Sequence, residues 1–107
     1  FGDVLLELTA PRIPCSTLAT RMGDPRFVDR FETAVRPGAY ARVLQAGTIV
    51  AGTTGRVTHA NESWSSINDL FALWLDPRAP REMLLEALRA PVGIRLRERF
   101  LQRATAD

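Results

Sequence analysis

The stretch VLLELTAPRIPCST, residues 4–17, decides how the fold begins. Val4, Leu6 and Leu8 alternate with their neighbours along its first half. A period of two over this length is typical of a half-buried strand. We therefore expect a strand with these three side chains on its core-facing side.

Two prolines end this strand, and the only cysteine of the chain follows them. Pro11 and Pro14 have no backbone N–H to donate to a sheet ladder. Cys15 therefore lies just past a strand end, in a stiffened loop of the kind that often carries chemistry. One cysteine cannot form an internal disulfide, so we expect a reducing, cytoplasmic compartment.

The composition suits one globular domain. The 107 residues are 46% apolar and 24% charged, with a formal net charge of +2. All 14 basic residues are Arg and 12 acids are spread among them, which argues against nucleic-acid binding. The longest apolar run, LFALWL at 70–75, is too short for a membrane helix, so we expect no membrane partner. The chain begins at Phe1 without a leader pattern, and we expect it to be part of a longer protein.

A helical insert and further strands are expected up to residue 60. Residues 16–38 have a helical pattern with a break at Gly23–Pro25. Asp24 is the expected N-cap of the second helix, with Pro25 at its first position. Strands are predicted at 39–44 and 48–51, joined by a turn at 45–47, with one more short strand at 56–60.

Residues 61–107 predict three short helices. Ser66 begins a capping box with Asp69, and apolar residues recur behind it at helical spacing. The helices are expected at 67–75, from Pro80 through Leu88, and from Pro91 to about Ala104. Three such helices can cover one small core. We expect the Arg residues of the last helix on its polar side rather than as a patch for an anionic partner.

Two interpretations of Cys15 are open from the residues alone. It is a small apolar side chain in the core, or it is a thiolate that reacts or binds a metal. Arg12 lies three residues before it and Arg21 six after, and a nearby guanidinium stabilises a thiolate. The N–H groups of a following helix would act in the same direction. Such a thiolate can attack an electrophile, carry a sulfur atom or ligate a soft metal.

Few other residues offer chemistry. His59 is the only histidine, and nothing local supports a Cys–His dyad. The chain has no CxxC motif, no paired-histidine zinc pattern and no P-loop. Tyr40 and Arg42 share one face of their predicted strand, and Arg42 points either to solvent or to an anion in a pocket.

Two segments, APRIPCSTLATRMGDPRFVDRF at 10–31 and RPGAYARVLQAGTIVAGT at 36–53, resemble the MOSC domain family, named for the C-terminal domain of molybdenum-cofactor sulfurases. The family pattern is a PRxPC-like segment after a strand, then G-x-Y-x-R-V-L and further glycines. Here it falls on Pro11, Arg12, Pro14, Cys15, Gly38, Tyr40, Arg42, Val43, Leu44, Gly47 and Gly52. The helical tail resembles the three-helix extension of the bacterial YiiM-type branch.

The resemblance implies a mixed β and α fold, with part of a MOSC-type β-barrel over 1–60 and a small three-helix bundle over 61–107. It implies that Cys15 ligates the metal of a pterin-based molybdenum cofactor (molybdopterin), while Arg12 and Arg42 contact anionic groups of cofactor or substrate. Related molybdoenzymes reduce N-hydroxylated compounds. The implied protein is thus an oxidoreductase with a small-molecule substrate and a redox partner that supplies electrons; pyridoxal phosphate is not expected.

The chain departs from the family pattern in two ways. The family domain is longer on its N-terminal side, so the missing N-terminal part of the same protein would supply the other strands. Gly52–Thr53 stands where the family often has Gly-Asp. Two other functions stay open: a sulfur carrier with a persulfide on Cys15 for metal–sulfur cluster assembly, and a binding module in which Cys15 is buried packing.

Overall fold

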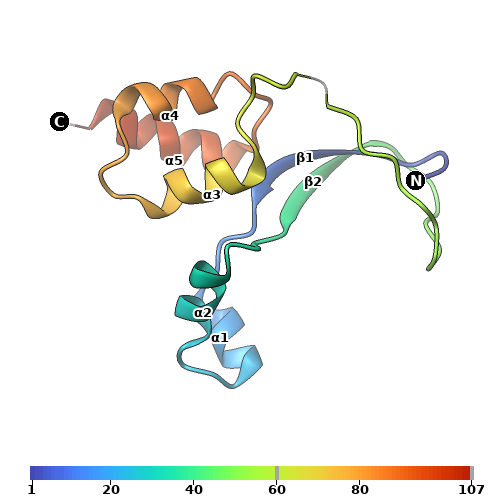
Figure 1. Ribbon diagram of the computed structural model, residues 1–107, viewed down its shortest axis with the longest axis horizontal. Helices are drawn as coiled ribbons and strands as arrows, with labels where there is room; N and C mark the ends of the chain where they lie inside the picture. The colour runs from blue at the N-terminus through green and yellow to red at the C-terminus, as the bar shows by residue number, and fades with distance from the viewer. Residues whose placement is uncertain (60, 107) are drawn as a thin grey trace.

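The computed structural model describes residues 1–59 and 61–106. Over these residues a two-stranded antiparallel sheet and five helices form a flat, branched molecule of 46 × 37 × 19 Å (Figure 1). In chain order the elements are β1 (Leu5–Pro11), α1 (Ser16–Met22), α2 (Phe27–Ala34), β2 (Ala39–Gln45), α3 (Ile67–Leu75), α4 (Arg81–Ala87) and α5 (Ile94–Thr105). This mixed β and α architecture, with three helices at the C-terminal end, is the fold class expected from the sequence.

The two strands pair side by side although a helical hairpin separates them in the chain. Leu6 lies opposite Val43, and Glu7 lies opposite Arg42. The register shifts between Leu8 and Ala10, so the ladder is irregular there. Because the strands leave and re-enter the sheet at the same end, the helical hairpin α1–α2 projects from that end (Figure 1).

The expected core-facing side of β1 is wrong for two of its three residues. Leu6 and Leu8 are 38% and 60% exposed, and Val43 on β2 is 62% exposed. Of the three residues expected to face the core, Val4, Leu6 and Leu8, only Val4 is buried. The three-helix unit meets the other side of the sheet, where Arg42, paired with Glu7, donates to the carbonyls of Pro91 and Val92 in the α4–α5 loop. The backbone N–H of Gly93 in the same loop donates to the carbonyl of Thr9 at 2.9 Å. The alternation therefore predicted the strand correctly, but the apolar face formed by Leu6, Leu8 and Val43 is not covered by any other described residue.

Residues 48–51 and 56–59 form no strand in the described structure, so these two predictions are wrong; Ala60 lies outside the described residues. Apolar spacing is not sufficient for a strand, because its N–H and C=O groups need a neighbouring strand. In the described residues β1 and β2 make up the whole sheet, and nothing pairs with this segment. Instead the segment passes close to Phe1, where a Cβ on Gly55 would lie 2.6 Å from the ring.

The hairpin α1–α2 follows the predicted break, with one correction. Gly23 ends α1 in the left-handed conformation, φ +64°. Helix α2 begins at Phe27 with Arg26 at its N-cap, so the prediction of Asp24 as N-cap is wrong. The Asp24 carboxylate accepts the backbone N–H of Arg26 at 2.9 Å, and its carbonyl accepts that of Phe27 at 3.0 Å. Asp24 therefore stabilises the turn before the helix rather than its first turn.

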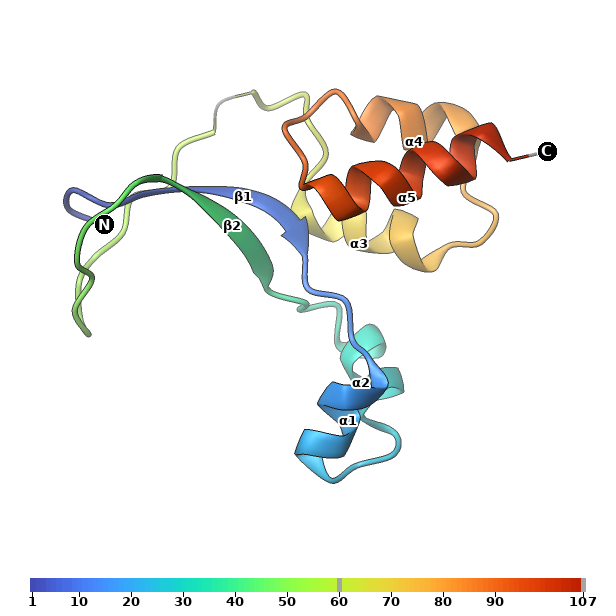
Figure 2. The same ribbon diagram turned by 180° about the vertical axis from the view of Figure 1, so that it is seen from behind.

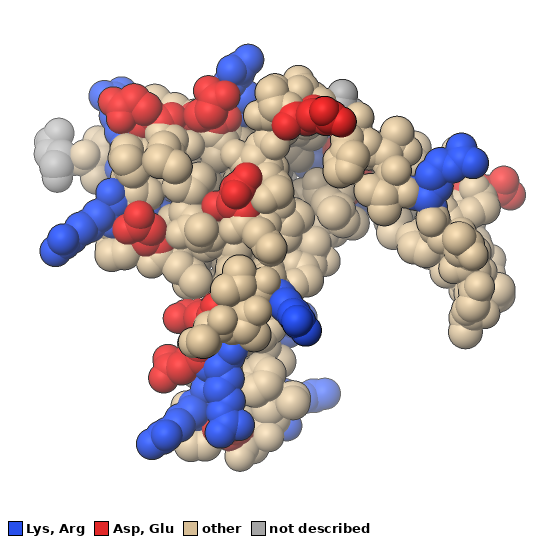
Figure 3. Space-filling model, in the orientation of Figure 1, with Lys and Arg blue, Asp and Glu red and all other residues tan. Residues whose placement is uncertain are grey.

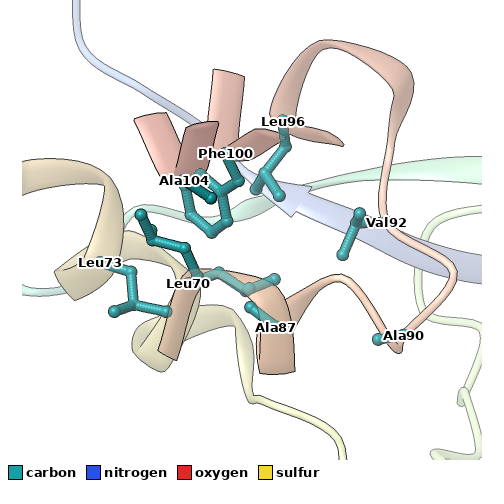
Figure 4. Close-up of a cluster of buried hydrophobic side chains, with 9 residues drawn as sticks. Leu70, Leu73, Ala87, Ala90, Val92, Leu96, Phe100 and Ala104 are labelled. Carbon is teal, nitrogen blue, oxygen red and sulfur yellow. The ribbon is translucent and has the colours of Figure 1, made fainter. Parts of the chain in front are cut away.

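The three-helix unit, α3 to α5, holds the main core of the chain. Ser66 caps α3: its hydroxyl accepts the N–H of Asp69 at 3.0 Å, and the Asp69 carboxylate accepts the N–H of Ser66 at 3.1 Å. This confirms the predicted capping box. Figure 4 shows side chains from all three helices meeting in one cluster. Its buried members are Leu70, Leu73, Leu84, Ala87, Ala90, Val92, Leu96, Phe100 and Ala104.

Two arginines of α5 stabilise this unit from its edges. Arg97 donates to the carbonyls of Leu88 and Ala90, each at 3.2 Å. Arg103 donates to the carbonyl of Leu73 at 2.9 Å and to that of Asp76. Carbonyls at helix ends lack partners within the helix, and these guanidinium groups supply them. Seen from behind, α5 crosses in front of the unit (Figure 2).

Across residues 1–59 and 61–106, every helix is too short or too polar to cross a membrane.

Candidate functional site

Cys15 lies where the chain has left β1 and starts α1. It occupies the N-cap position of α1 with an extended backbone, φ −141° and ψ 169°. Its side chain is exposed, whereas Pro14 beside it is buried. The interpretation of Cys15 as a buried apolar side chain is therefore wrong, and reagents can reach the thiol.

The segment that carries Cys15 is closed at its base, which we call the neck of the hairpin. There the backbone N–H of Arg12 donates to the carbonyl of Gly38 at 3.3 Å. Gly38 has φ +71°, a conformation that glycine adopts without the steric cost other residues have. The order of the two motifs thus has a local geometric meaning: one motif leaves the sheet at the neck and the other returns there.

The surroundings of the Cys15 thiol lower its pKa. The pKa of Cys15 is lowered chiefly by the backbone N–H of Leu18, and also by the N–H and hydroxyl of Thr17. Partial desolvation by neighbouring groups opposes this effect, and the Arg12 guanidinium adds a smaller lowering. The sulfur makes no full capping hydrogen bond, so the effect is that of several partial positive charges near it. The sequence predicted both causes, the helix start and the guanidinium.

Arg42 faces the three-helix unit. Its guanidinium lies 3.4 Å from the Glu7 carboxylate and donates to the carbonyls of Pro91 and Val92 at 3.3 and 3.5 Å. Within the described residues, the hydrogen bonds and the ion pair of Arg42 go to Glu7, Pro91 and Val92, and none goes to Arg12 or Cys15. Its side chain is still 44% exposed, so its expected role toward an anion stays a prediction. What the structure shows is a connection between the sheet and the α4–α5 loop.

No second reactive group accompanies Cys15 in the described residues. His59 is exposed. No three His, Cys, Asp or Glu side chains come together in a metal-binding arrangement anywhere in residues 1–59 and 61–106. On the face drawn in Figure 3, acidic and basic side chains are mixed over the three-helix unit and on the hairpin, so no continuous basic surface forms there. The chemistry available here is that of one exposed thiol whose pKa is lowered by nearby N–H groups and, to a smaller extent, by the Arg12 guanidinium.

The sequence did not single out Thr17 or Leu18, and it gave Gly38 as part of the family pattern without a role of its own. The first two matter through backbone N–H groups, which every residue carries, so their types gave no signal. The available signal was positional: they are the second and third residues of a helix that begins right after the cysteine. Gly38 had a signal in its residue type, because glycine between a proline and a strand often marks a left-handed conformation.

Comparison with known proteins gives three results. The sequence profile of the MOSC domain matches residues 1–55. A protein of Gibberella moniliformis described as a reductase is 39% identical over 67 residues, which are 62% of this chain and 12% of that protein. The crystal structure of YiiM from Geobacillus stearothermophilus superposes with a TM-score of 0.87 and 25% identity, covering 95% of this chain and 53% of that one.

This chain matches only part of each of these two proteins. The chain spans about half the length of the YiiM chain and about an eighth of the reductase. The matched region of the profile includes β1, the neck, Cys15, the hairpin and β2. The YiiM likeness extends further, into the three-helix unit.

Proposed function

The chain belongs to the MOSC domain family, and from that premise we propose that Cys15 is the thiolate ligand of a molybdenum cofactor in the reduction of N-hydroxylated small molecules. The observation that carries this proposal is the exposed thiol with a lowered pKa at the start of α1. A soft, deprotonated sulfur is the kind of ligand that such a metal takes from a protein. The similarity to a protein described as a reductase also supports it.

The residues present fit one part of such a cofactor. The cofactor, when bound, would supply the redox-active metal and take up electrons from an external donor. Cys15 would hold the metal, and Arg12 would offer its guanidinium to an anionic group of the cofactor or the substrate. Pro14, buried beside the thiol, limits the backbone freedom of this segment and so helps to orient the sulfur.

We also propose that a further part of the same protein completes the site. Leu6, Leu8 and Val43 form an apolar face that nothing covers in the described residues. Large exposed apolar faces usually mark a contact with another segment or protein. This supports the expectation of additional barrel strands, which would also exclude water from the neighbourhood of Cys15.

A second candidate function, sulfur transfer, uses the same thiolate. The Cys15 sulfur would attack the terminal sulfur of a donor persulfide, forming a Cys15 persulfide while the donor leaves as a thiolate. Exposure of Cys15 favours this reading, because a donor protein must reach the thiol.

The test is elemental analysis for molybdenum, with pterin fluorescence, on the full-length protein from a host that makes the cofactor. Wild type, Cys15→Ser and the matched surface variant Arg99→Ala are prepared together. Near-stoichiometric molybdenum in wild type and Arg99→Ala but not in Cys15→Ser is the expected result. Absence of molybdenum from all three, in a host that loads a control molybdoenzyme, refutes the ligand role. Cyanide-releasable sulfur that depends on Cys15 would then support sulfur transfer.

A further inference from the structure

We propose that Phe31 is a positioning residue: by packing against Phe71 of the three-helix unit, it holds the α1–α2 hairpin, and with it Cys15, in one orientation relative to the sheet. The importance of this contact for catalysis rests on the proposed role of Cys15. The docking of the hairpin by Phe31 does not depend on that role.

The hairpin has a narrow connection to the sheet. Both of its linkers pass through the neck, where one backbone hydrogen bond joins Arg12 to Gly38. The return linker contains two left-handed residues, Val35 at φ +53° and Gly38 at φ +71°. A hairpin held only at such a neck could rotate as a unit, since few backbone angles would need to change. A second point of attachment is needed to fix its orientation.

Phe31 on α2 provides this second attachment. Its ring lies 6.2 Å from the ring of Phe71 on α3, at an interplanar angle of 73°. This edge-to-face arrangement is a favourable one for aromatic pairs. Phe27, one helical turn earlier, lies 6.2 Å from Phe31 and supports it from within α2.

The burial of Phe71 shows that the contact belongs to the fold. Phe71 is among the largest fully buried side chains, at 2% exposed. Yet it is not a member of the buried cluster at the centre of the three-helix unit. Residues outside that cluster therefore contribute to the burial of the Phe71 ring, and Phe31 is one of them.

The three-helix unit thus contacts the chain at one point before Cys15 in the sequence and at one point after it. Before the cysteine, the N–H of Gly93 binds the carbonyl of Thr9 on β1 at 2.9 Å. After it, Phe71 binds Phe31 on α2. Cys15 lies between these two points in the sequence and moves with α1. A shift of about 1 Å at a reacting group can cost a large factor in rate, so this support gives the C-terminal unit a role at the site.

The chain offers a direct optical test. Its single cysteine is exposed and accepts a fluorescent label, and its two tryptophans, Trp64 and Trp74, both pack against the three-helix core. Energy transfer from tryptophan to a label on Cys15 therefore reports the distance between that unit and the hairpin. The variants are Phe31→Ala, the conservative Phe31→Leu, and Met22→Ala as a control on the same hairpin, where Met22 is 57% exposed.

We expect Phe31→Ala to lower the ratio of docked to undocked hairpin about tenfold, because it removes an aromatic pair and its buried area. In Phe31→Ala, energy transfer from tryptophan to the label falls and the fluorescence of the label depolarises faster. In Phe31→Leu most of the energy transfer is restored, and Met22→Ala behaves as wild type. Wild-type transfer in Phe31→Ala, or an equal loss in Met22→Ala, overturns the proposal.

Circular dichroism separates undocking from unfolding. If Phe31→Ala also loses helical signal, Phe31→Leu decides: wild-type transfer supports the proposal, and a loss as large as in Phe31→Ala overturns it. The pH dependence of Cys15 alkylation should not change in Phe31→Ala, because the N–H groups that stabilise the thiolate belong to α1. Molybdenum content of the unlabelled variants tests the ligand role separately, so either idea can fail without the other.

Discussion

Arg103 offers a quantitative test of how the three-helix unit is held together. Its guanidinium donates to the carbonyl of Leu73, in the last turn of α3, and to that of Asp76 just beyond it. It also lies 5.8 Å from the centre of the Phe100 ring. Arg103→Ala removes all three contacts and leaves the Leu73 carbonyl without a protein partner, whereas the Asp76 carbonyl still accepts the N–H of Ala79 at 3.3 Å.

The expected cost follows from these contacts. A hydrogen bond from a charged donor contributes roughly 1.5–3 kcal/mol when buried. Water can replace the donor at Asp76, which is exposed, so we count about one full bond and add roughly 0.5 kcal/mol for the cation–π contact. Arg103→Ala should therefore lower the free energy of unfolding by about 2–3.5 kcal/mol, with a fall in Tm on the order of 10 °C.

Urea unfolding followed by tryptophan fluorescence measures this change, with Arg99→Ala as the matched control. Arg99 lies on the same helix, is exposed and makes no hydrogen bond within residues 1–59 and 61–106, so its replacement should cost less than about 0.5 kcal/mol. Arg103→Lys keeps the charge but cannot reach two carbonyls with a fork, and should recover about 1 kcal/mol at most. A cost for Arg103→Ala no larger than for Arg99→Ala would refute the reasoning.

Three further predictions rest on other parts of the chain. The lowered pKa of Cys15 means that its alkylation rate rises with pH and levels off at a lower pH in the folded protein than in urea; coincident profiles would contradict the environment described for the thiol. Ser66→Ala breaks the capping box with Asp69 and should cost about 1 kcal/mol in urea unfolding, whereas Ser65→Ala should change little. Val35→Gly relieves a β-branched residue at φ +53°, and slower hydrogen exchange of the hairpin amides, equivalent to a gain of up to ~1 kcal/mol, is the expected outcome; faster exchange would show that the Val35 side chain stabilises the hairpin instead.

Local patterns were sufficient for the elements whose stability is local. The capping box at Ser66 and Asp69 and the apolar spacing behind it predicted α3 correctly, because both depend on residues within one or two helical turns. The break at Gly23 was also predicted, since a left-handed helix end has a strong residue preference. For the site, the sequence placed Cys15 after a strand and before a helix, with Arg12 nearby, and the structure has that order.

The errors concern pairing and burial, which depend on distant residues. Residues 48–51 have strand-like composition but no partner strand among the described residues. Leu6 and Leu8 have the alternation of a core face, but the three-helix unit covers the other side of β1. A short pattern shows that one side of a strand is apolar, and it does not contain the information about which element lies against that side.

By itself, the sequence determined the helix and strand periods, the caps, the single thiol and the motif that places this chain in its family. These are properties of residue type and spacing over a few positions. Only the tertiary structure decided that Cys15 is exposed, that Arg42 joins the sheet to the α4–α5 loop, and that Phe31 meets Phe71. Each of these depends on residues from separate parts of the chain coming together, and burial and docking are free-energy differences that no single segment carries.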